Sequence, residues 1–371
     1  MFPLEPSAAH RALPEDLPFA RELPLQAVRL DSASSGPRLI MTAAVHGNET
    51  HGTYAMRRLL EDFGSGQLQL LRGRLTLVPI ANPKAWRLKR RHGDRNLNRR
   101  LLPSANPVCY EDWAANWLCP LLAEHEGLLD LHSFQRGDAP FALIGPENNP
   151  GPLEAFALAS VEEAVALRLG CKRFLHGWLP TYADGIQRRA RWVEATGSVR
   201  SAKSVKLAES TEAPDDGERH VDLDPLYGVG TTEYMRRCGG WAVTLECGEH
   251  EDPEGPEVAY RAMVHTLAYF GMIDVPPPAV SSDPQVLCLY TVVDRLDKDD
   301  TLARAWRNFD PVSSGEPIAT RANGDAIHAG QDAFVIFPNA HARPGQEWFY
   351  LARQDGRLKP SPEVPLPFVH P

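Results

Sequence analysis

The chain of 371 residues is long enough for two domains, because most domains contain roughly 100–200 residues. Its content of 43% hydrophobic and 23% charged residues is typical of a globular protein and excludes intrinsic disorder as the dominant state. The 33 prolines are nearly twice the average share of about 5%, which excludes a long helical rod. The net charge of −9 argues against binding nucleic acid over a broad surface.

Three further features of the sequence predict a cytoplasmic location and no membrane partner. No apolar stretch reaches the roughly 18 residues that a membrane-spanning helix needs. The N-terminus lacks the basic start and apolar core of a secretion signal. The six cysteines are scattered and form no CxxC pair, so we expect reduced and mostly packed thiols rather than a disulfide framework.

Upstream of residue 275 the chain is predicted to form an α/β domain. Short apolar runs alternate there with segments of helical periodicity, which indicates a largely parallel or mixed sheet. In chain order, we predict strands over 39–45, 74–80, 128–131 and 241–245. Helices are predicted over 55–63, with Gly64 as its C-cap, and over 110–125, 153–169 and 257–270.

The remaining segments complete the predicted organisation. Residues 1–37 form an N-terminal arm of the catalytic domain, which as a whole spans 1–275. Residues 184–224 are polar and have no sustained period, so we expect a long loop or hairpin insertion. The stretch 276–284 is rich in proline and is the predicted linker. Beyond it, a small all-β domain is expected over 285–371, with β-like runs at 286–293, 317–320, 333–337 and 348–351.

Chemically competent side chains follow three of the predicted strands. His46 and Glu49 come after the first, His132 follows the strand that ends at 131, and Glu246 follows the strand that ends at 245. In open α/β sheets, ligands bind outside the carboxyl ends of the strands, so we expect these residues to share a site. If the turn after residue 45 opens a helix, His46 and Glu49 lie on one face of it and can hold one ion.

Two histidines and one carboxylate form a ligand set that catalytic zinc uses. A single histidine at a strand end is more often structural, but the joint pattern of His46, Glu49 and His132 favours a metal site. We place Asp130 on the opposite face of its strand and do not expect it to orient His132. Glu246 lies outside the ligand set and suits a carboxylate that moves a proton during amide hydrolysis. Its alternative role is a structural, salt-bridging carboxylate.

The segment 84–100 contains eight lysines and arginines among seventeen residues. One interpretation is a surface loop that balances acidic neighbours. The other is an arginine-lined cleft that holds carboxylates through bidentate hydrogen bonds. A nucleic-acid patch is disfavoured by the net charge and by the single aromatic residue there, Trp86.

Taken in order, several short motifs resemble the succinylglutamate desuccinylase/aspartoacylase family, a branch of the zinc carboxypeptidase-like hydrolases. The motifs are HGNE (46–49), NP (82–83), Arg91, DRNLNR (94–99), DLHSF (130–134) and TLECG (244–248). The resemblance covers roughly residues 37–275. It implies a carboxypeptidase-like mixed sheet flanked by helices, a small C-terminal all-β domain, and one zinc ion per chain. The implied activity is removal of an acyl group from an N-acyl amino acid.

The resemblance also implies roles for single residues. His46, Glu49 and His132 match the zinc ligands of the family. Glu246 matches its general base and acid, which takes a proton from a zinc-bound water and passes it to the departing amine.

Further matched positions concern the substrate. Asn98 and Arg99 match a pair that binds the substrate carboxylate, and Arg91 matches an arginine that polarises the scissile carbonyl and stabilises the oxyanion. Arg236 falls at a second carboxylate-binding arginine. Asn96 departs from the family pattern, which has aspartate in D-L-N-R, and we expect this change to alter substrate preference. A tyrosine often contributes in the family, and the candidates here are Tyr227, Tyr234, Tyr290 and Tyr350.

Three functions are therefore compared. The first is a zinc-dependent amidohydrolase that acts on a small acidic N-acyl amino acid. The second is a metallocarboxypeptidase that acts on peptides, against which the β domain argues because it narrows the cleft in the deacylases. The third is a non-catalytic zinc or small-molecule binding protein. A homo-oligomer is expected by analogy of fold alone.

Overall fold

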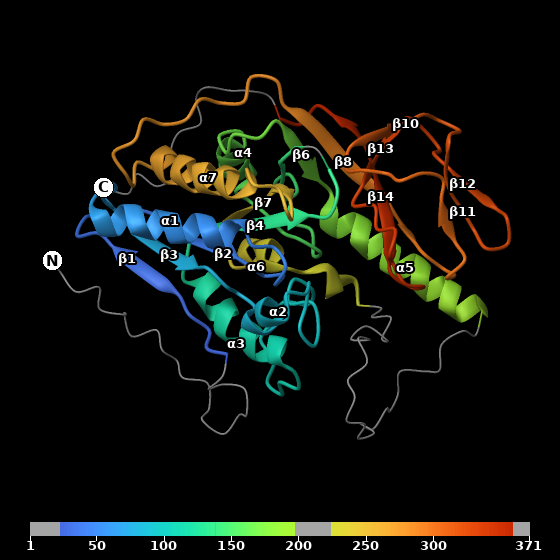
Figure 1. Ribbon diagram of the computed structural model, residues 1–371, viewed down its shortest axis with the longest axis horizontal. Coiled ribbons are helices and arrows are strands. Elements are labelled where there is room, and N and C mark those ends of the chain that lie inside the picture. Colours follow the sequence, from blue (N-terminus) through green and yellow to red (C-terminus); the bar gives the residue numbers. More distant parts are fainter. Residues whose placement is uncertain (1–22, 138, 197–223, 359–371) are drawn as a thin grey trace. The chain divides into compact units, whose positions relative to one another are not determined.

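The computed structural model describes residues 23–137, 139–196 and 224–358, and the chain divides into two compact units (Figure 1). The first unit comprises Met1–Gly177, Val229–Cys288 and Gln354–Pro371, and the second comprises Trp178–Gly228 and Leu289–Arg353. The predicted boundaries at 275 and 285 differ from this division. The chain passes between the units four times: after Gly177, after Gly228, and inside the strands that contain Cys288 and Gln354.

The first unit is built on a mixed sheet, as the sequence predicts. Its strands lie in the order β1-β3-β2-β4-β7-β5-β6-β8. The neighbouring strands β3, β2, β4 and β7 are parallel. Strand β1 runs antiparallel to β3, and β5 runs antiparallel to β7. The strand bounds are β1 (Val28–Asp31), β2 (Arg38–Ala43), β3 (Arg74–Val78), β4 (Gly127–Phe134), β5 (Phe141–Leu143), β6 (Arg173–His176), β7 (Trp241–Glu249) and β8 (Gln285–Asp294).

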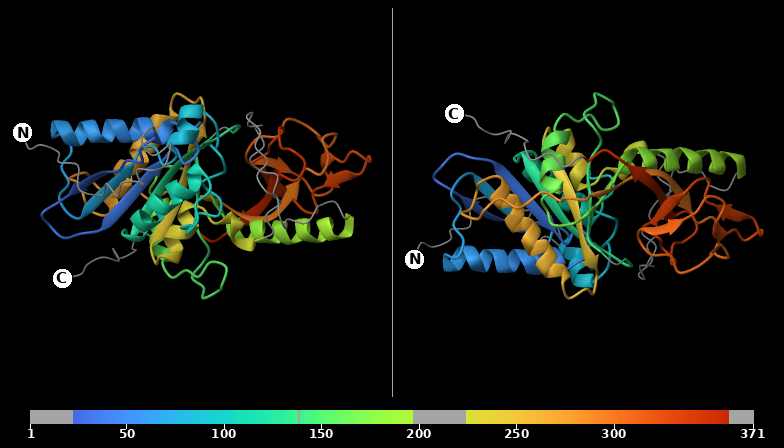
Figure 2. Two further views of the ribbon diagram at one scale, coloured as in Figure 1. Left: turned by 90° about the horizontal axis from the view of Figure 1, so that it is seen from below. Right: turned by 90° about the horizontal axis from the view of Figure 1, so that it is seen from above.

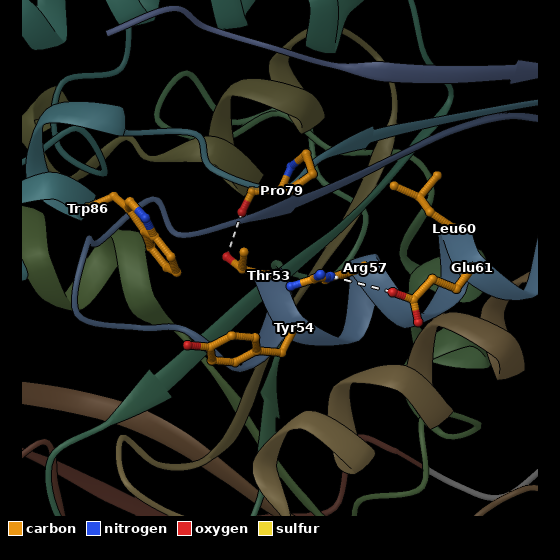
Figure 3. A pocket seen from close by; sticks show the side chains of 7 residues that line it. All are labelled: Thr53, Tyr54, Arg57, Leu60, Glu61, Pro79 and Trp86. Carbon is orange, nitrogen blue, oxygen red and sulfur yellow. Dashed lines mark hydrogen bonds and ion pairs between the residues drawn. The ribbon is translucent and has the colours of Figure 1, made fainter. Parts of the chain in front are cut away.

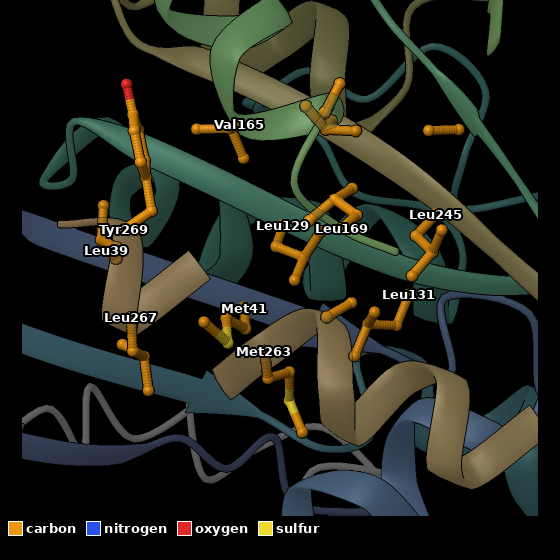
Figure 4. Close-up of a cluster of buried hydrophobic side chains, with 14 of the residues drawn as sticks. Leu39, Met41, Leu129, Leu131, Val165, Leu169, Leu245, Met263, Leu267 and Tyr269 are labelled. Atoms are coloured by element: carbon orange, nitrogen blue, oxygen red, sulfur yellow. The ribbon is translucent and has the colours of Figure 1, made fainter. Parts of the chain in front are cut away.

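Helices cover both faces of this sheet (Figure 2). Leu39 and Met41 of β2 pack into a cluster with α1 (His51–Ser65), α4 (Ala159–Ala166) and α7 (Gly255–Tyr269), shown in Figure 4. Ile40, between them, packs into a second cluster with α3 (Tyr110–Ala123) and α6 (Thr231–Arg237). Successive side chains of a strand point to opposite faces, so a continuous apolar run can fill both clusters.

The predicted helices exist, and most of their ends differ from the predicted ones, most clearly in α1 and α4. Helix α1 ends at Ser65, and its left-handed C-cap is Gly66 with φ 78°, not Gly64. Helix α4 covers only part of the predicted segment 153–169, because Leu153 to Leu158 form an irregular segment in which Phe156 makes an isolated bridge. Within the described residues, no helix combines the length and the apolarity needed to cross a membrane.

The second unit combines one long helix with short strands. Its larger sheet runs in the order β8-β14-β13-β10, and a smaller one in the order β12-β11-β9. Trp306, Ile318 and Phe349 contribute to its buried core. The bounds are β9 (Thr301–Leu302), β10 (Asp310–Val312), β11 (Pro317–Thr320), β12 (Ala326–His328), β13 (Ala333–Ile336) and β14 (Glu347–Asp355). The β content predicted beyond residue 285 is confirmed.

The expected loop at 184–224 is wrong in its first part. Helix α5 (Trp178–Thr196) includes residues 184–196, and η1 (Pro225–Gly228) follows the segment. The apolar stripe of α5 consists of Leu179, Tyr182 and Ile186, so most of it precedes the polar segment on which the prediction was based. Residues 197–223 lie outside the described residues, as do residues 1–22 of the predicted arm and 359–371 of the predicted β domain.

Candidate active site

A turn, and not a helix, brings His46 and Glu49 together. The backbone N–H of Glu49 donates to the carbonyl of His46 at 3.1 Å, and α1 begins only at His51. The expectation of a helical i,i+3 pair is therefore wrong in its cause, although the two side chains do meet. A spacing of three residues brings two side chains together in a turn as it does in a helix.

Gly47 lets this turn pack against α2 (Pro83–Leu88). A Cβ atom at Gly47 would lie 1.9 Å from the carbonyl carbon of Ala85, so only glycine fits there. Asn82 caps α2 by accepting a hydrogen bond from the N–H of Ala85 at 3.1 Å, and Pro83 occupies the first turn, where its missing N–H costs nothing. The NP motif therefore supports the loop that carries His46.

The predicted ligand set converges in the buried interior of the first unit. The Nδ1 atom of His46 lies 2.8 Å from Glu49 Oε1, and the Nδ1 atom of His132 lies 2.7 Å from Glu49 Oε2. One donor atom from each residue lies within 4.8 Å of the others, and all three residues are buried. Two imidazole nitrogens and a carboxylate at this separation fit a zinc ion with an open position.

The far nitrogens of both imidazoles are also engaged. His46 Nε2 lies 3.1 Å from Asn96 Oδ1, and His132 Nε2 lies 2.7 Å from Asp130 Oδ2. The expectation that Asp130 does not orient His132 is wrong, because residues two apart in a strand share a face. Such outer partners fix the ring and its tautomer, leaving both Nδ1 atoms directed at Glu49.

Asp130 is itself held in place from two sides. Thr42 Oγ1 donates to Asp130 Oδ1 at 2.5 Å, and the hydroxyl of Thr231 donates to Oδ2. All of these groups are buried. The carboxylate that orients His132 is therefore fixed before any ligand binds.

The charges of the cluster are strongly coupled. Burial opposes ionisation of Glu49, but the attraction of His46 and His132 outweighs it and holds the pKa of Glu49 well below its usual range. Burial also opposes a charge on His132, but Asp130 and Glu49 on either side raise the pKa of His132 well above its usual range. Burial, helped by Arg91, lowers the pKa of His46 to about 3. The two carboxylates, Asp130 and Glu49, create a negative potential at His132, and such a potential also favours binding of a metal cation.

Glu246 lies beside the ligand set on the neighbouring strand. It is the register partner of His132 in the parallel pair of β4 and β7. Only 8% of the residue is exposed, and its Oε2 atom is buried with no hydrogen-bond partner among the described residues. Burial, together with the negative charge of Glu49, raises the pKa of Glu246 to about 8. A carboxyl group tuned in this way can exchange a proton near neutral pH.

The basic segment 84–100 is held by acidic neighbours. Glu111, fully buried, accepts hydrogen bonds from the backbone N–H groups of residues 93–95 at 2.9–3.2 Å. Lys84 pairs with Asp94, and Arg95 pairs with Asp112 at 2.9 Å. The interpretation as a charge-balanced loop is therefore correct for these two cations.

Arg91 is the member of this segment that reaches the ligand set. Its Nη1 atom lies 3.2 Å from Glu49 Oε1, while 47% of its side chain remains exposed. A guanidinium in contact with both the cluster and solvent can meet an incoming substrate. The predicted oxyanion role for Arg91 stays a prediction.

Asn98 and Arg99 follow directly after Asn96. Asn98 Oδ1 accepts a hydrogen bond from the N–H of Thr231 at 3.0 Å, and Arg99 donates from Nη1 to the carbonyl of Asn98 at 2.9 Å. The amide oxygen of Asn98 is thus already used, which leaves its NH2 group as the donor for a substrate carboxylate. Their substrate contacts stay predictions.

Arg236 lies in a buried ion-pair network. Its guanidinium lies 2.9 Å from Glu162 and 2.9 Å from Glu154, and it donates to the carbonyl of Ala242 at 2.7 Å. Only 4% of the residue is exposed. This environment favours a structural role for Arg236 over the predicted contact with a substrate carboxylate.

Three residues around the cluster carry no assigned role in the sequence analysis. Thr231 contacts both Asp130 and Asn98, and Glu111 anchors the basic loop. His250 Nδ1 lies 2.8 Å from Ser133 Oγ, next to His132 in the chain. The two-residue spacing from Asp130 to His132 is a sequence pattern that predicts their contact, since both lie on one face of a strand. The contacts of Thr231 and Glu111 join distant segments and leave no such pattern.

A surface hollow elsewhere on the first unit is shown in Figure 3. Its lining is contributed by α1, α2 and Pro79, the residue that follows β3, with Tyr54 and Trp86 as its aromatic members. It contains none of the predicted site residues, so it is separate from the candidate active site.

Fold and site together define a mixed α/β chain with a buried cluster of His46, Glu49 and His132. Residues 35–167 match the model of the succinylglutamate desuccinylase/aspartoacylase catalytic domain. The resemblance stated from the motifs is thereby confirmed, and the chain is similar to this family of hydrolases. A search of curated proteins finds no match.

Solved structures show the same fold at low sequence identity. A succinylglutamate desuccinylase/aspartoacylase from Rhodobacter sphaeroides has a TM-score of 0.62 at 16% identity, with 89% of each chain covered. The ectoine utilization protein EutE (DoeB) from Ruegeria pomeroyi, a product-bound structure, has a TM-score of 0.59 at 18% identity, with 88% of each chain covered. The succinylglutamate desuccinylase from Chromobacterium violaceum has a TM-score of 0.59 at 19% identity, covering 89% of this chain and 88% of its own. The predicted fold class is confirmed.

Proposed function

We propose that the protein is a zinc-dependent hydrolase that cleaves the amide bond of a small acidic N-acyl amino acid. The observation that carries this proposal is the convergence of both Nδ1 atoms on Glu49, while Asn96 and Asp130 engage the opposite ring nitrogens. His46, Glu49 and His132 would hold one zinc ion per chain. Zinc in such a site would supply a Lewis acid that polarises a carbonyl and lowers the pKa of a water molecule, which makes that water a better nucleophile once it loses a proton.

Glu246 is the proposed general base and acid. Its buried Oε2 lacks a hydrogen-bond partner, so it can accept a proton from an attacking water and return it to the departing amine. Its position opposite His132 on the adjacent strand places it next to the ligand set without belonging to it.

Arg91 is proposed to stabilise the oxyanion, since it contacts Glu49 and remains accessible. Asn98 and Arg99 are proposed to bind a carboxylate of the substrate. The names of the similar structures support a substrate of the acyl amino acid class. The pairing of Arg236 with Glu162 and Glu154 limits the number of carboxylate-binding groups that we assign.

The test is Glu246→Gln, assayed by release of amine from a panel of N-acyl amino acids. We expect turnover to fall about 100- to 10,000-fold, the usual contribution of a general acid–base group, while bound zinc stays at the level of the unmodified protein. Glu251→Gln, which changes an exposed carboxylate near the same strand end, is the matched control and should leave turnover unchanged. Full activity of Glu246→Gln would disprove the assigned mechanism.

The same panel separates the alternative functions. A metallocarboxypeptidase would release C-terminal residues from peptides faster than it releases amines from N-acyl amino acids. A non-catalytic binding protein would bind zinc and release no amine from any member of the panel.

A further inference from the structure

A second cluster of metal-binding side chains lies outside the candidate active site. It consists of His176, the last residue of β6, Cys288 in β8, and Asp355, the last residue of β14. One nitrogen, one sulfur and one oxygen atom from these residues lie within 4.8 Å of one another. All three residues belong to the first unit and are half-buried.

The pairing of the strands brings these residues together from distant parts of the chain. β6 and β8 are parallel neighbours, and His176 is the register partner of Cys288. Partners in adjacent strands are about 5 Å apart and point to the same face. β14 is the next strand after β8 in the sheet, so its last residue can complete the group.

The imidazole of His176 is directed into this cluster without a well-oriented partner. Its Nε2 atom is buried and forms no hydrogen bond of good geometry within the described residues, although it lies 3.2 Å from Asp355 Oδ2. A buried ring nitrogen left in this state is costly unless something else contacts it. Burial, followed by the charge of Arg357, lowers the pKa of His176, which keeps the ring neutral as a metal ligand requires.

The surroundings orient the carboxylate and neutralise the nearby cation. Asp355 Oδ1 accepts a hydrogen bond from the N–H of Arg357 at 2.7 Å, which leaves Oδ2 directed toward His176. The guanidinium of Arg357 pairs with Glu163 at 2.8 Å and donates to the carbonyl of Gly145. This ion pair offsets part of the positive charge that Arg357 exerts on His176.

We propose that His176, Cys288 and Asp355 form a second metal site that takes a zinc-like transition-metal ion. Zinc accepts imidazole, thiolate and carboxylate together, and three protein ligands leave a fourth position for water. Magnesium and calcium prefer sites made only of oxygen atoms, so this donor set excludes them. On binding, the Cys288 thiol forms a sulfur–metal bond and releases its proton to solvent.

The site is independent of the proposed hydrolysis, because it shares no residue with the His46–Glu49–His132 cluster. An ion there would join segments that are more than sixty residues apart in sequence at each step. Cross-links that close long loops restrict the unfolded chain most, so we assign the site a structural role and expect metal binding to raise Tm.

Cobalt(II) is a suitable probe, because a thiolate ligand gives it a near-ultraviolet charge-transfer absorption that imidazole and carboxylate ligands do not give. Metal-free full-length protein is titrated with cobalt(II) alone. We expect this absorption to develop in the unmodified protein and to be lost in Cys288→Ser. Asp355→Asn should weaken cobalt binding by about 10-fold or more, as loss of a ligand charge implies.

Cys238→Ser is the matched control, because Cys238 is exposed and belongs to no candidate cluster. It should keep the absorption and the cobalt-dependent rise in Tm. The proposal is overturned if the unmodified protein gives no thiolate absorption, or if the absorption persists in Cys288→Ser. His46→Ala should retain the signal, so loss of the first site and loss of the second are distinguished.

Discussion

Asn96→Ala tests whether the amide of Asn96 positions a metal ligand. Asn96 Oδ1 lies 3.1 Å from His46 Nε2 and accepts a hydrogen bond from the N–H of Asn98 at 2.9 Å. Each such bond contributes about 0.5–1.5 kcal/mol, so removing both costs about 1–3 kcal/mol. If this cost falls on the metal-bound state, the dissociation constant for zinc rises about 5- to 150-fold.

The measurement is competition for zinc between the protein and a chromogenic chelator, with circular dichroism to confirm that the variant is folded. Asn116→Ala is the matched control, since Asn116 also makes two contacts, at 2.6 and 2.9 Å, but to the backbone of Ser104. It should leave zinc affinity unchanged. Folded Asn96→Ala with native affinity would refute a positioning role. Asn96→Asp should bind zinc more tightly, because a carboxylate makes the imidazole more basic.

Three further predictions concern the surroundings of the site. Arg236→Met should lower the free energy of unfolding by about 3–5 kcal/mol in urea titrations, because it leaves Glu162 buried without its partner, and KM of any folded enzyme should change little. Burial, opposed by Arg236, raises the pKa of Glu154 from 4.5 to about 7, so the folded state retains its proton more strongly. The stabilisation of the folded state is therefore complete below pH 4.5 and is lost as pH rises through about 7. Glu154→Gln should remove this part of the pH dependence of the free energy of unfolding. An unchanged pH profile of unfolding would contradict the assignment. Gly47→Ala should weaken zinc binding, because the new Cβ displaces α2. Gly64→Ala is the control: nothing lies within 4 Å of its new Cβ, so it should raise the free energy of unfolding by up to about 1 kcal/mol and leave zinc affinity unchanged. Equal zinc affinity in the two variants would contradict the steric argument.

The convergence of His46, Glu49 and His132 could be predicted because these residues follow buried strands. Apolar runs mark where the strands lie, and the carboxyl ends of neighbouring parallel strands meet at one edge of the sheet. His132 and Glu246 are in fact paired in register within longer strands than predicted. Both strands extend three or four residues beyond the predicted ends, to Phe134 and Glu249, and this leaves the proximity of the two residues unchanged.

The outer partners were harder to predict, for two different reasons. The contact of Asp130 with His132 obeys a local rule, because residues two apart in a strand share a face; the prediction placed them on opposite faces. Glu111 and Thr231 act through contacts with segments that are 16 or more residues away in sequence, which no local pattern reveals. The same holds for Arg236, whose buried carboxylate partners come from another helix and a loop.

Helix α5 shows how a segment boundary can mislead. The stretch from residue 184 is polar because it continues a helix whose buried residues, such as Tyr182, lie before it. Arg189 then forms ion pairs with Asp294 and Glu347 at 2.7 and 3.1 Å. A charged face of a long helix and a polar loop have similar compositions, so composition alone cannot separate them.

The two histidines of the cluster differ in their outer partners, and this difference bears on Asn96, which stands where the pattern of the similar family has aspartate. His132 lies between two carboxylates, Asp130 and Glu49, whereas His46 has one carboxylate and a neutral amide. A carboxylate partner makes an imidazole a stronger donor, so the amide of Asn96 leaves more positive charge on an ion bound there. A more positive ion binds less tightly but polarises a carbonyl more strongly. Substrate preference at residue 96 stays a prediction. If the proposed zinc ion is bound by His46, the contact of Asn96 with that ring predicts an effect on the ion as well.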